Sequence, residues 1–269
     1  MRLALSTLGL PGQPLIDVLR LASDHGWHGL ELRCAPGEAV HVGMSAAQRR
    51  AAARACAASG LTPLAVAGYT GVAAPGPDEP ILATLRDELR LAADLGAPHL
   101  RVFPRGGNTP DADTRAVCRL RSVADEAQAL GVRILLETHD SHARGTDAAR
   151  VVRAVGRPEV GVLWDVLHTV RSGESPAQSF AALAPHLGYL QVKDVASLTD
   201  LTPIALGAGV LPLKESLDLM PDQSWAVWEY EAAWHPTAAP LPGLLAAGAK
   251  YLTGSIRSAP CPPSRLPAN

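Results

Sequence analysis

Four apolar, strand-like segments in the second half of the sequence each end in a side chain that offers an oxygen atom to a ligand. These oxygen donors are Glu137, Asp165, Gln191 and Glu229. A buried parallel strand is normally apolar along its length, so a polar group at its end requires an explanation. Three carboxylates buried together without a counter-charge would repel one another and would be costly to desolvate. A divalent cation removes both penalties, so the pattern predicts a metal site with these four side chains as ligands.

The predicted donor set contains only oxygen atoms, which favours Mn²⁺ or Mg²⁺ first and Co²⁺ or Zn²⁺ after them. The competing interpretation pairs each carboxylate with a neighbouring arginine or lysine. It is reasonable for any single residue, but it is disfavoured for four residues at matching strand ends. Glu231 would face the same side of its strand as Glu229, because side chains along a strand alternate, so either could be the last ligand.

The elements that must position these residues are visible as short apolar segments that alternate with longer helical ones. We expect strands at Leu3–Ser6, Gly29–Arg33, Leu64–Ala67, His99–Phe103, Arg133–Glu137, Gly161–Asp165, Tyr189–Lys193 and Ala226–Glu231. We expect helices at Leu15–His25, Ala46–Ser59, Ile81–Leu95, Thr114–Leu130, Ala148–Val155, Pro176–Leu183, Leu213–Met220 and Leu241–Leu252. Eight strand–helix units predict a single (β/α)₈ TIM barrel, because eight parallel strands close such a barrel. An open doubly wound sheet is the alternative, but no glycine-rich dinucleotide fingerprint follows the first strand.

In a barrel of this kind the active site lies at the carboxyl ends of the strands, where the four oxygen donors fall. Residues 1–254 form the predicted barrel domain, and the proline-rich tail at residues 255–269 is expected to be irregular. Proline and glycine are also frequent in Ala73–Pro80, which follows the third strand on the catalytic face. That segment could close over the site as a lid or be a solvated loop.

Composition and charge exclude several classes of protein. The 269 residues are 47% hydrophobic and 19% charged, which is typical of a globular domain. The net charge is −2 and lysine and arginine do not cluster, so we expect no nucleic-acid partner. No apolar stretch reaches the ~18 to 20 residues of a membrane span, and the N-terminus lacks the features of a signal peptide. The four cysteines are far apart and suggest neither a zinc site nor a disulfide framework, so reduced thiols in a cytoplasmic protein are the simplest expectation.

Taken in order, these motifs resemble the xylose-isomerase-like TIM barrels, a superfamily often labelled sugar phosphate isomerase/epimerase. The resemblance covers Met1 to about Leu252. It is carried by Gly29–Arg33, Leu136–His139, Trp164–His168, Gln191–Asp194, Leu206–Gly209 and Trp228–Glu231. The ordered set is specific to the superfamily and not to one reaction within it. The resemblance implies a metal-dependent enzyme.

In that family a metal is held by Glu, Asp, His and Glu from these four strand ends. The resemblance therefore implies Glu137, Asp165 and Glu229 as three of the ligands, and it favours Glu229 over Glu231. Gln191 stands at the family's histidine position, as in some relatives that include dehydroshikimate dehydratases. Loss of that nitrogen ligand makes Mn²⁺ or Mg²⁺ more plausible than Zn²⁺.

Three side chains close to the ligands could carry the chemistry. His168 occupies the histidine position of the family's D-x-x-H motif, which touches a substrate hydroxyl or carbonyl oxygen, and its imidazole could move a proton there; otherwise it is a capping or loop residue. Lys193 could neutralise a substrate carboxylate, phosphate or enolate, or it could pair with Asp194 or another acidic loop residue. His139 would lie on the same face as Glu137 and could orient it. The predicted catalytic residues are His168, Lys193 and Glu137.

Other polar or aromatic residues are expected to line the mouth of the barrel. They are Glu31, Arg33, His139, His142, Arg144, Glu231, Trp234 and His235. His142 and Arg144 could bind an anionic group or be solvated. Ketose 3-epimerases of the superfamily carry a second catalytic Glu six residues after the metal Glu of the fifth strand, and that position is Ala143 here. This departure counts against their two-carboxylate mechanism.

The leading hypothesis is a metal-dependent isomerase, epimerase or dehydratase that acts on a small sugar or polyhydroxylated keto compound. The metal would stabilise an enediolate, and His168 or Lys193 would carry the proton. One alternative is a dehydroshikimate-dehydratase-like lyase. Another is a phosphodiesterase of the endonuclease IV type, which needs more histidine ligands and a basic face. A third is a barrel that binds sugar without turnover. The partner is expected to be a small molecule, and the sequence leaves a homo-oligomer open.

Overall fold

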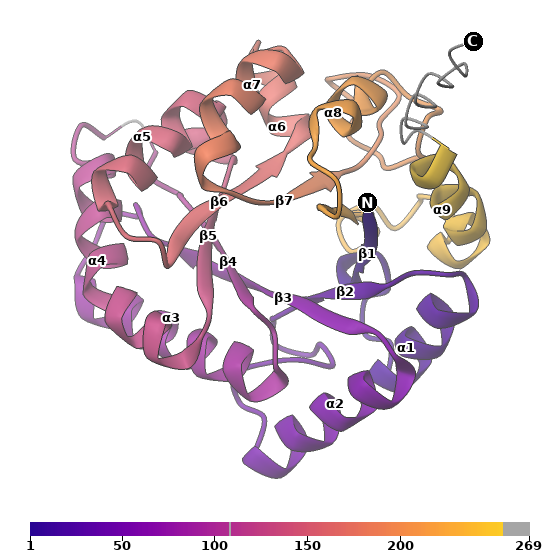
Figure 1. Cartoon of the computed structure of the whole chain (residues 1–269), viewed down its shortest axis with the longest axis horizontal. Helices are drawn as coiled ribbons and strands as arrows, with labels where there is room; N and C mark the ends of the chain where they lie inside the picture. Colours follow the sequence, from indigo (N-terminus) through magenta and orange to yellow (C-terminus); the bar gives the residue numbers. More distant parts are fainter. Residues whose placement is uncertain (108, 255–269) are drawn as a thin grey trace, which may run out of the picture.

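Eight parallel strands close into a barrel in which each strand pairs with the next and the last pairs with the first (Figure 1). The computed structural model describes residues 1–107 and 109–254. The strands are β1 (Arg2–Ser6), β2 (Gly29–Arg33), β3 (Thr62–Gly71), β4 (His99–Phe103), β5 (Arg133–Glu137), β6 (Val160–Asp165), β7 (Leu187–Val192) and β8 (Trp225–Trp228). This architecture confirms the predicted (β/α)₈ TIM barrel. The tail expected to be irregular, residues 255–269, lies outside the described residues.

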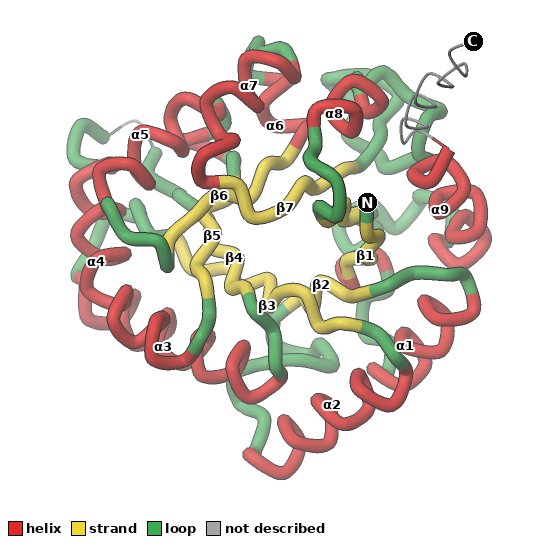
Figure 2. Tube along the Cα trace, viewed as in Figure 1, coloured by secondary structure: helices red, strands yellow, loops and turns green. Residues whose placement is uncertain are grey.

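Helices form a ring around the strands (Figure 2). They are α1 (Leu15–Asp24), α2 (Ala46–Ser59), α3 (Asp78–Leu95), α4 (Ala112–Leu130), α5 (Gly145–Val155), α6 (Val166–Arg171), α7 (Pro176–Leu183), α8 (Leu213–Leu219) and α9 (Leu245–Gly254). The short helix α6 was not predicted. It begins directly after β6, because the Asp165 side chain accepts a hydrogen bond from the His168 amide (3.2 Å) and caps the first turn. In the described part of the chain, no helix is both long and apolar enough to cross a bilayer.

The side chains inside the barrel lie in layers. An apolar layer that includes Leu135, Leu163, Tyr189 and Val227 fills the interior. Each of these four residues stands two positions before one of the predicted oxygen donors. Because side chains along a strand alternate between its two faces, the donors form the next layer toward the carboxyl ends of the strands. The barrel therefore presents a polar layer that rests on an apolar plug.

The eighth strand is shorter than predicted. We expected it to run from Ala226 to Glu231, but it ends at Trp228. The amide of Glu229 still donates to the Val192 carbonyl oxygen (2.9 Å), so this residue keeps its place beside β7. The chain then turns away, and Glu231 lies outside the ladder.

The segment Ala73–Pro80, predicted as a lid or a solvated loop, is held to α4 by one buried arginine. The Arg119 guanidinium donates hydrogen bonds to the carbonyl oxygens of Val72, Ala74 and Gly76. Its Nε also bonds the Asp78 carboxylate at 2.7 Å. The side chain of Arg119 is fully buried, so the segment is anchored although most of it is exposed. Whether it opens and closes stays a hypothesis.

A carboxyl group is buried between α3 and β3. Glu88 is 4% exposed and accepts hydrogen bonds from the Thr70 hydroxyl (2.9 Å) and the Tyr69 amide (3.3 Å). A Cβ atom at Gly68 would lie 2.6 Å from Glu88 Oε2, so only glycine leaves room for this carboxyl. Burial raises the pKa of Glu88 from 4.5 to about 7. The folded state therefore retains a proton that the unfolded chain has released.

This difference predicts that the stability of the fold depends on pH. Between pH 4.5 and 7 the folded state binds more protons than the unfolded chain, so the free energy of unfolding falls as pH rises, by about 3 kcal/mol in total. Glu88→Gln keeps the shape but cannot ionise, so its stability relative to the parent should rise over that interval and level off above it. Denaturant titrations at several pH values measure this. Glu79→Gln, at an exposed position of the same helix, is the control. If the free energies of unfolding of the parent and of Glu88→Gln changed in parallel with pH, the raised pKa of Glu88 would be contradicted.

Candidate active site

The four predicted oxygen donors each stand at the carboxyl end of one of the strands β5 to β8. Glu137, Asp165, Gln191 and Glu229 are each 4% exposed or less. Burial raises the pKa of Glu137 to about 8, although the Arg101 charge opposes the shift. The carboxylates of Glu229 and Asp165 contribute to the same increase, which indicates that the three acidic groups are close enough to repel one another.

The ammonium group of Lys193 lies among three carboxylates. Its Nζ is 2.9 Å from Asp165 Oδ2 and also forms ion pairs with Glu229 and Glu231. Burial alone would lower the pKa of Lys193, but the Asp165 and Glu229 charges raise it well above its ordinary value. Lys193 is therefore a permanent cation in the ligand layer. The predicted ion pair with an acidic loop residue is present, but the residue is Glu231 and not Asp194.

Asp194 instead organises the loop that follows β7. Its carboxylate accepts hydrogen bonds from the amides of Val195, Gly207, Gly209 and Leu211. A Cβ atom at Gly209 would lie 2.2 Å from Asp194 Oδ1, which explains the glycine there. The motif at Leu206–Gly209 is thus fixed to the strand end by one carboxylate.

Arg101 is a site residue that the sequence analysis missed. It lies in β4, is 2% exposed, and donates from Nη1 to Glu137 Oε2 at 2.9 Å. Its guanidinium carbon lies 4.1 Å from the centre of the Phe103 ring, a cation–π contact. Its Nε is buried without a hydrogen-bond partner. The signal was available, because a charged residue in the middle of a buried strand is as unusual as one at its end.

Glu31 lies below the ligand layer rather than at the mouth where we expected it. It is fully buried and accepts a hydrogen bond from the Tyr189 hydroxyl (2.6 Å). The Gln191 Nε2 atom lies 3.1 and 3.2 Å from its two oxygens. The other amide atom, Gln191 Oε1, is buried with no hydrogen-bond partner.

Two imidazoles lie beside Glu137. The rings of His139 and His168 are 4.0 Å apart between centres. Burial, the His139 charge and the Lys193 charge lower the pKa of His168 well below its ordinary value. Burial also opposes protonation of His139, but its hydrogen bond to Asp140 and the Glu137 charge raise its pKa overall. Among the described residues, the ligand atoms of Glu137, His139 and His168 all lie within 4.8 Å of one another, which makes these three a possible metal-binding group. The carboxylates of Glu137, Asp165 and Glu229 are not gathered as closely as this.

A cavity of about 370 Å³ opens onto these groups. The polar side chains on its wall are Arg101, Glu137, His139, His168, Glu229 and Glu231. Its remaining wall includes Tyr69, Phe103, Leu201 and Trp234. The cavity is large enough for one small polar molecule, with ring and aliphatic surface that can exclude water.

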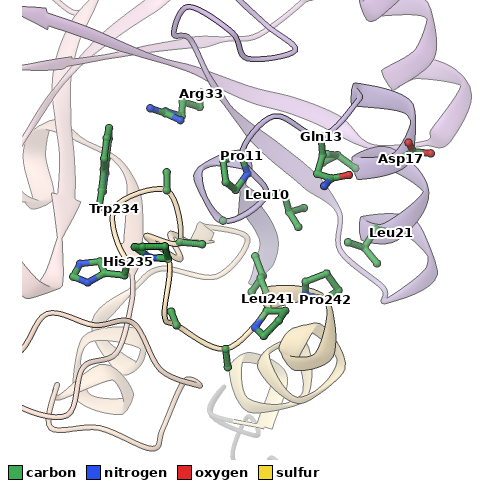
Figure 3. Close-up of a pocket in the computed structure, with 18 of the residues that line it drawn as sticks. Leu10, Pro11, Gln13, Asp17, Leu21, Arg33, Trp234, His235, Leu241 and Pro242 are labelled. Atoms are coloured by element: carbon green, nitrogen blue, oxygen red, sulfur yellow. The ribbon is translucent and has the colours of Figure 1, made fainter.

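A larger groove of about 920 Å³ adjoins this cavity. Figure 3 shows its wall, with Trp234 and His235 on one side and Pro11, Gln13 and Leu21 on another. Trp234 lines both spaces, and the Arg33 guanidinium carbon lies 4.9 Å from its ring centre. Of the residues that we expected at the mouth from the second and eighth strands, Arg33 and His235 line the groove, Glu231 lines the cavity and Trp234 lines both, whereas Glu31 lines neither.

His142 and Arg144 are not on the wall of the cavity. His142 is buried, with Nε2 3.0 Å from Asp113 Oδ1 and Nδ1 2.9 Å from the Ser141 hydroxyl. Arg144 is exposed at the start of α5. Neither residue is brought to the ligand layer, so a role for them in binding an anionic substrate stays a prediction.

A family model described as the xylose isomerase-like TIM barrel matches residues 19–254. The chain belongs to this family. The resemblance inferred from the motifs is thereby confirmed. No curated protein sequence matches the chain.

Solved structures of several enzymes share the fold of this xylose isomerase-like barrel. A probable 3-DHS dehydratase from Bacillus anthracis is 18% identical, covers 94% of this chain and 99% of its own, and has a TM-score of 0.79. The IOLI protein, with a bound zinc atom, is 16% identical, covers 96% and 100%, and has a TM-score of 0.80. An L-ribulose 3-epimerase is 16% identical, covers 94% of each chain, and has a TM-score of 0.78. At these identities the likeness shows the fold and not the reaction.

Proposed function

We propose that this protein is a divalent-metal-dependent enzyme that isomerises, epimerises or dehydrates a small sugar or polyhydroxylated keto compound. The observation that carries the proposal is an imbalance of charge at the barrel mouth. The acidic groups of Glu137, Asp165, Glu229 and Glu231 lie there, and that of Glu31 lies beneath them. The permanent cations in the same layer are Arg101 and Lys193. A divalent ion would compensate most of the remaining negative charge.

Two buried oxygen atoms support a metal site in this layer. Gln191 Oε1 has no hydrogen-bond partner, and the ion pair of Asp165 Oδ2 with Lys193 lacks hydrogen-bond geometry. Buried acceptors are normally satisfied, so these two atoms are suited to ligate an ion. Glu137, Asp165, Gln191 and Glu229 would hold it. Oxygen ligands favour Mn²⁺ or Mg²⁺, with Co²⁺ or Zn²⁺ as alternatives.

A second ligand set is Glu137 with His139 and His168, which lie within 4.8 Å of one another. Two imidazoles and one carboxylate would favour Zn²⁺ or Fe²⁺ over Mg²⁺. The zinc atom bound to the IOLI protein shows that a protein with this fold can hold that ion. The metal preference of the purified protein therefore distinguishes the two ligand sets.

The side chains around the cavity support proton transfer at a carbon next to a carbonyl group. A bound divalent ion would supply Lewis-acid polarisation of a substrate oxygen. His168 is held neutral by burial and faces the cavity, so it can accept a proton from the substrate. His139, whose pKa is raised, can donate one from the adjacent position. Arg101 fixes Glu137, and the rings of Phe103 and Trp234 keep water from the reacting atoms.

The charge of the cavity disfavours the phosphodiesterase alternative. Its wall carries Glu137, Glu229 and Glu231, which would repel a nucleic-acid backbone. Whether the enzyme is an epimerase or a dehydratase depends on the functional groups that the substrate carries next to the carbon that loses its proton. Neighbours of both kinds share the fold, and Ala143 stands where the ketose 3-epimerases carry a second carboxylate.

Metal removal tests the proposal directly. We expect the chelated protein to lose turnover of a panel of ketoses, inositol-type ketones and hydroxy-keto acids, and to regain it with Mn²⁺ or Mg²⁺. Metal content by elemental analysis and product formation by chromatography are the two measurements. Turnover that persists below about one ion per ten chains would overturn metal dependence. Stoichiometric metal binding without turnover of any compound would favour a sugar-binding barrel.

A further inference from the structure

Three fully buried side chains form a hydrogen-bonded row that begins beneath the ligand layer and ends at Gln191 within it. Tyr189 donates from its hydroxyl to Glu31 Oε2 at 2.6 Å. Gln191 donates from Nε2 to Glu31 Oε1 at 3.1 Å and to Oε2 at 3.2 Å. None of the three lines the 370 Å³ cavity, so none is placed to touch the substrate. Any effect of Tyr189 and Glu31 on the site must therefore pass through the side chain of Gln191.

The chemistry of the row fixes which way the Gln191 amide faces. The amide nitrogen lies within hydrogen-bond distance of both Glu31 oxygens and donates to them, and an amide oxygen in its place would set acceptor against acceptor. The reversed amide would place Gln191 Oε1 against two carboxylate oxygens and would leave its NH₂ group facing the ligand layer. The present orientation instead directs Oε1 away from Glu31, and that atom has no partner. A glutamine can ligate a metal ion through its oxygen, so only this orientation is competent.

Tyr189 in turn holds Glu31. Its hydroxyl occupies Oε2, and the aromatic ring is part of the apolar plug, so the donor is rigidly placed. Metal-ligating side chains are commonly oriented by a partner on their far side, and removal of such a partner typically weakens metal binding by about 10- to 100-fold. The row Tyr189–Glu31–Gln191 has this arrangement.

We propose that Glu31 and Tyr189 are positioning residues that hold the Gln191 amide with Oε1 toward the metal. This inference rests on the metal site of the proposed function. It assigns to Glu31 a role below the site, in place of the substrate contact expected from the sequence. It also explains how a glutamine can serve as a metal ligand, although rotation of its amide could equally turn Oε1 or Nε2 toward the ion.

A double-mutant cycle tests the inference, with Mn²⁺ affinity of the metal-free protein measured by calorimetry. Glu31→Gln should weaken Mn²⁺ binding about 10- to 100-fold, partly by loss of charge and partly because two facing amides can pair either way. In the Gln191→Ala background there is no amide to orient, so Glu31→Gln should cost only the charge part. A penalty at least several-fold larger in the parent background supports positioning. Equal penalties in both backgrounds overturn it.

Two further variants separate the possible failures. Tyr189→Phe removes the hydroxyl without changing charge and should weaken Mn²⁺ binding in the same direction; an unchanged affinity would contradict its role. Glu88→Gln, a buried carboxyl outside the site, is the control and should leave Mn²⁺ affinity unchanged. If the parent protein does not bind Mn²⁺ at all, the oxygen-ligand site of the proposed function fails. If the parent binds and the cycle shows no coupling, only the positioning inference fails.

Discussion

Replacement of His168 by glutamine is expected to lower kcat by about 10² to 10⁴ while the bound metal stays nearly unchanged. Glutamine keeps a similar size and can still form hydrogen bonds, but it cannot accept a proton near neutral pH. The side chain of His168 faces the cavity. Its backbone amide donates a hydrogen bond to Asp165 Oδ1, and this bond does not depend on the side chain that is replaced. Steady-state kinetics and elemental analysis of the same preparation measure the two effects.

The matched variant is Glu137→Gln, which should lose metal and activity together. An anionic ligand is replaced there by a neutral one, although the new amide oxygen can still accept the hydrogen bond from Arg101. The contrast between the two variants is the test. Loss of metal from His168→Gln would show that His168 is a ligand, as in the group with Glu137 and His139. If His168→Gln left both metal and turnover intact, His168 would not be the proton carrier, and the permanent charge of Lys193 makes that side chain a poor replacement.

Removal of the Lys193 charge is expected to destabilise the metal-free protein by about 3 to 5 kcal/mol, which corresponds to a Tm lower by roughly 10 °C. Lys193→Met keeps the length of the side chain but leaves Asp165, Glu229 and Glu231 without their shared counter-charge. Mn²⁺ should restore much of the loss, because an ion that binds only the folded state stabilises it. The affinity for Mn²⁺ should also rise, since the ammonium no longer occupies the carboxylates.

Thermal unfolding with and without Mn²⁺ measures both effects. Lys214→Met is the control, because Lys214 is 66% exposed in its pair with Asp218 and such pairs contribute about 0 to 1 kcal/mol. A Lys193→Met protein whose Tm matches the parent in the absence of metal would show that the buried carboxylates are protonated rather than paired. In that case the charge imbalance behind the proposed function would be smaller than the geometry suggests.

The eight strands could be predicted because each is a run of apolar residues bounded by turn residues. Their polar ends could be recognised for the same reason, since a carboxylate such as Glu137 or Asp165 interrupts an otherwise apolar run. The end of β8 was misplaced because the alternation continues past Trp228 in the sequence while the backbone turns away from the ladder. Alternation alone does not report where hydrogen bonding stops.

The partners of the site residues could not be predicted. Tyr189 resembles an ordinary apolar strand residue in the sequence. Its hydroxyl reaches Glu31 of β2 only because closure of the barrel brings β7 within three strands of β2. The contact between Lys193 and Glu229 likewise joins neighbouring strands whose relative register the sequence does not specify. Arg101 could have been predicted as a site residue, because a charged side chain in the middle of a buried strand indicates a polar group inside the barrel.

The apolar plug beneath the ligand layer closes the barrel at the side away from the cavity. Leu135, Leu163, Tyr189 and Val227 are each fully buried and seal the floor under the oxygen donors. Trp234 and Leu201 stand on the wall of the cavity that opens onto the donors from the other side. Under the proposed function, the metal ion would bind before the substrate and dissociate after it, because bound substrate would cover the ion. Metal and substrate would then bind in a fixed order and dissociate in the reverse order. Water could reach the metal only while no substrate is bound.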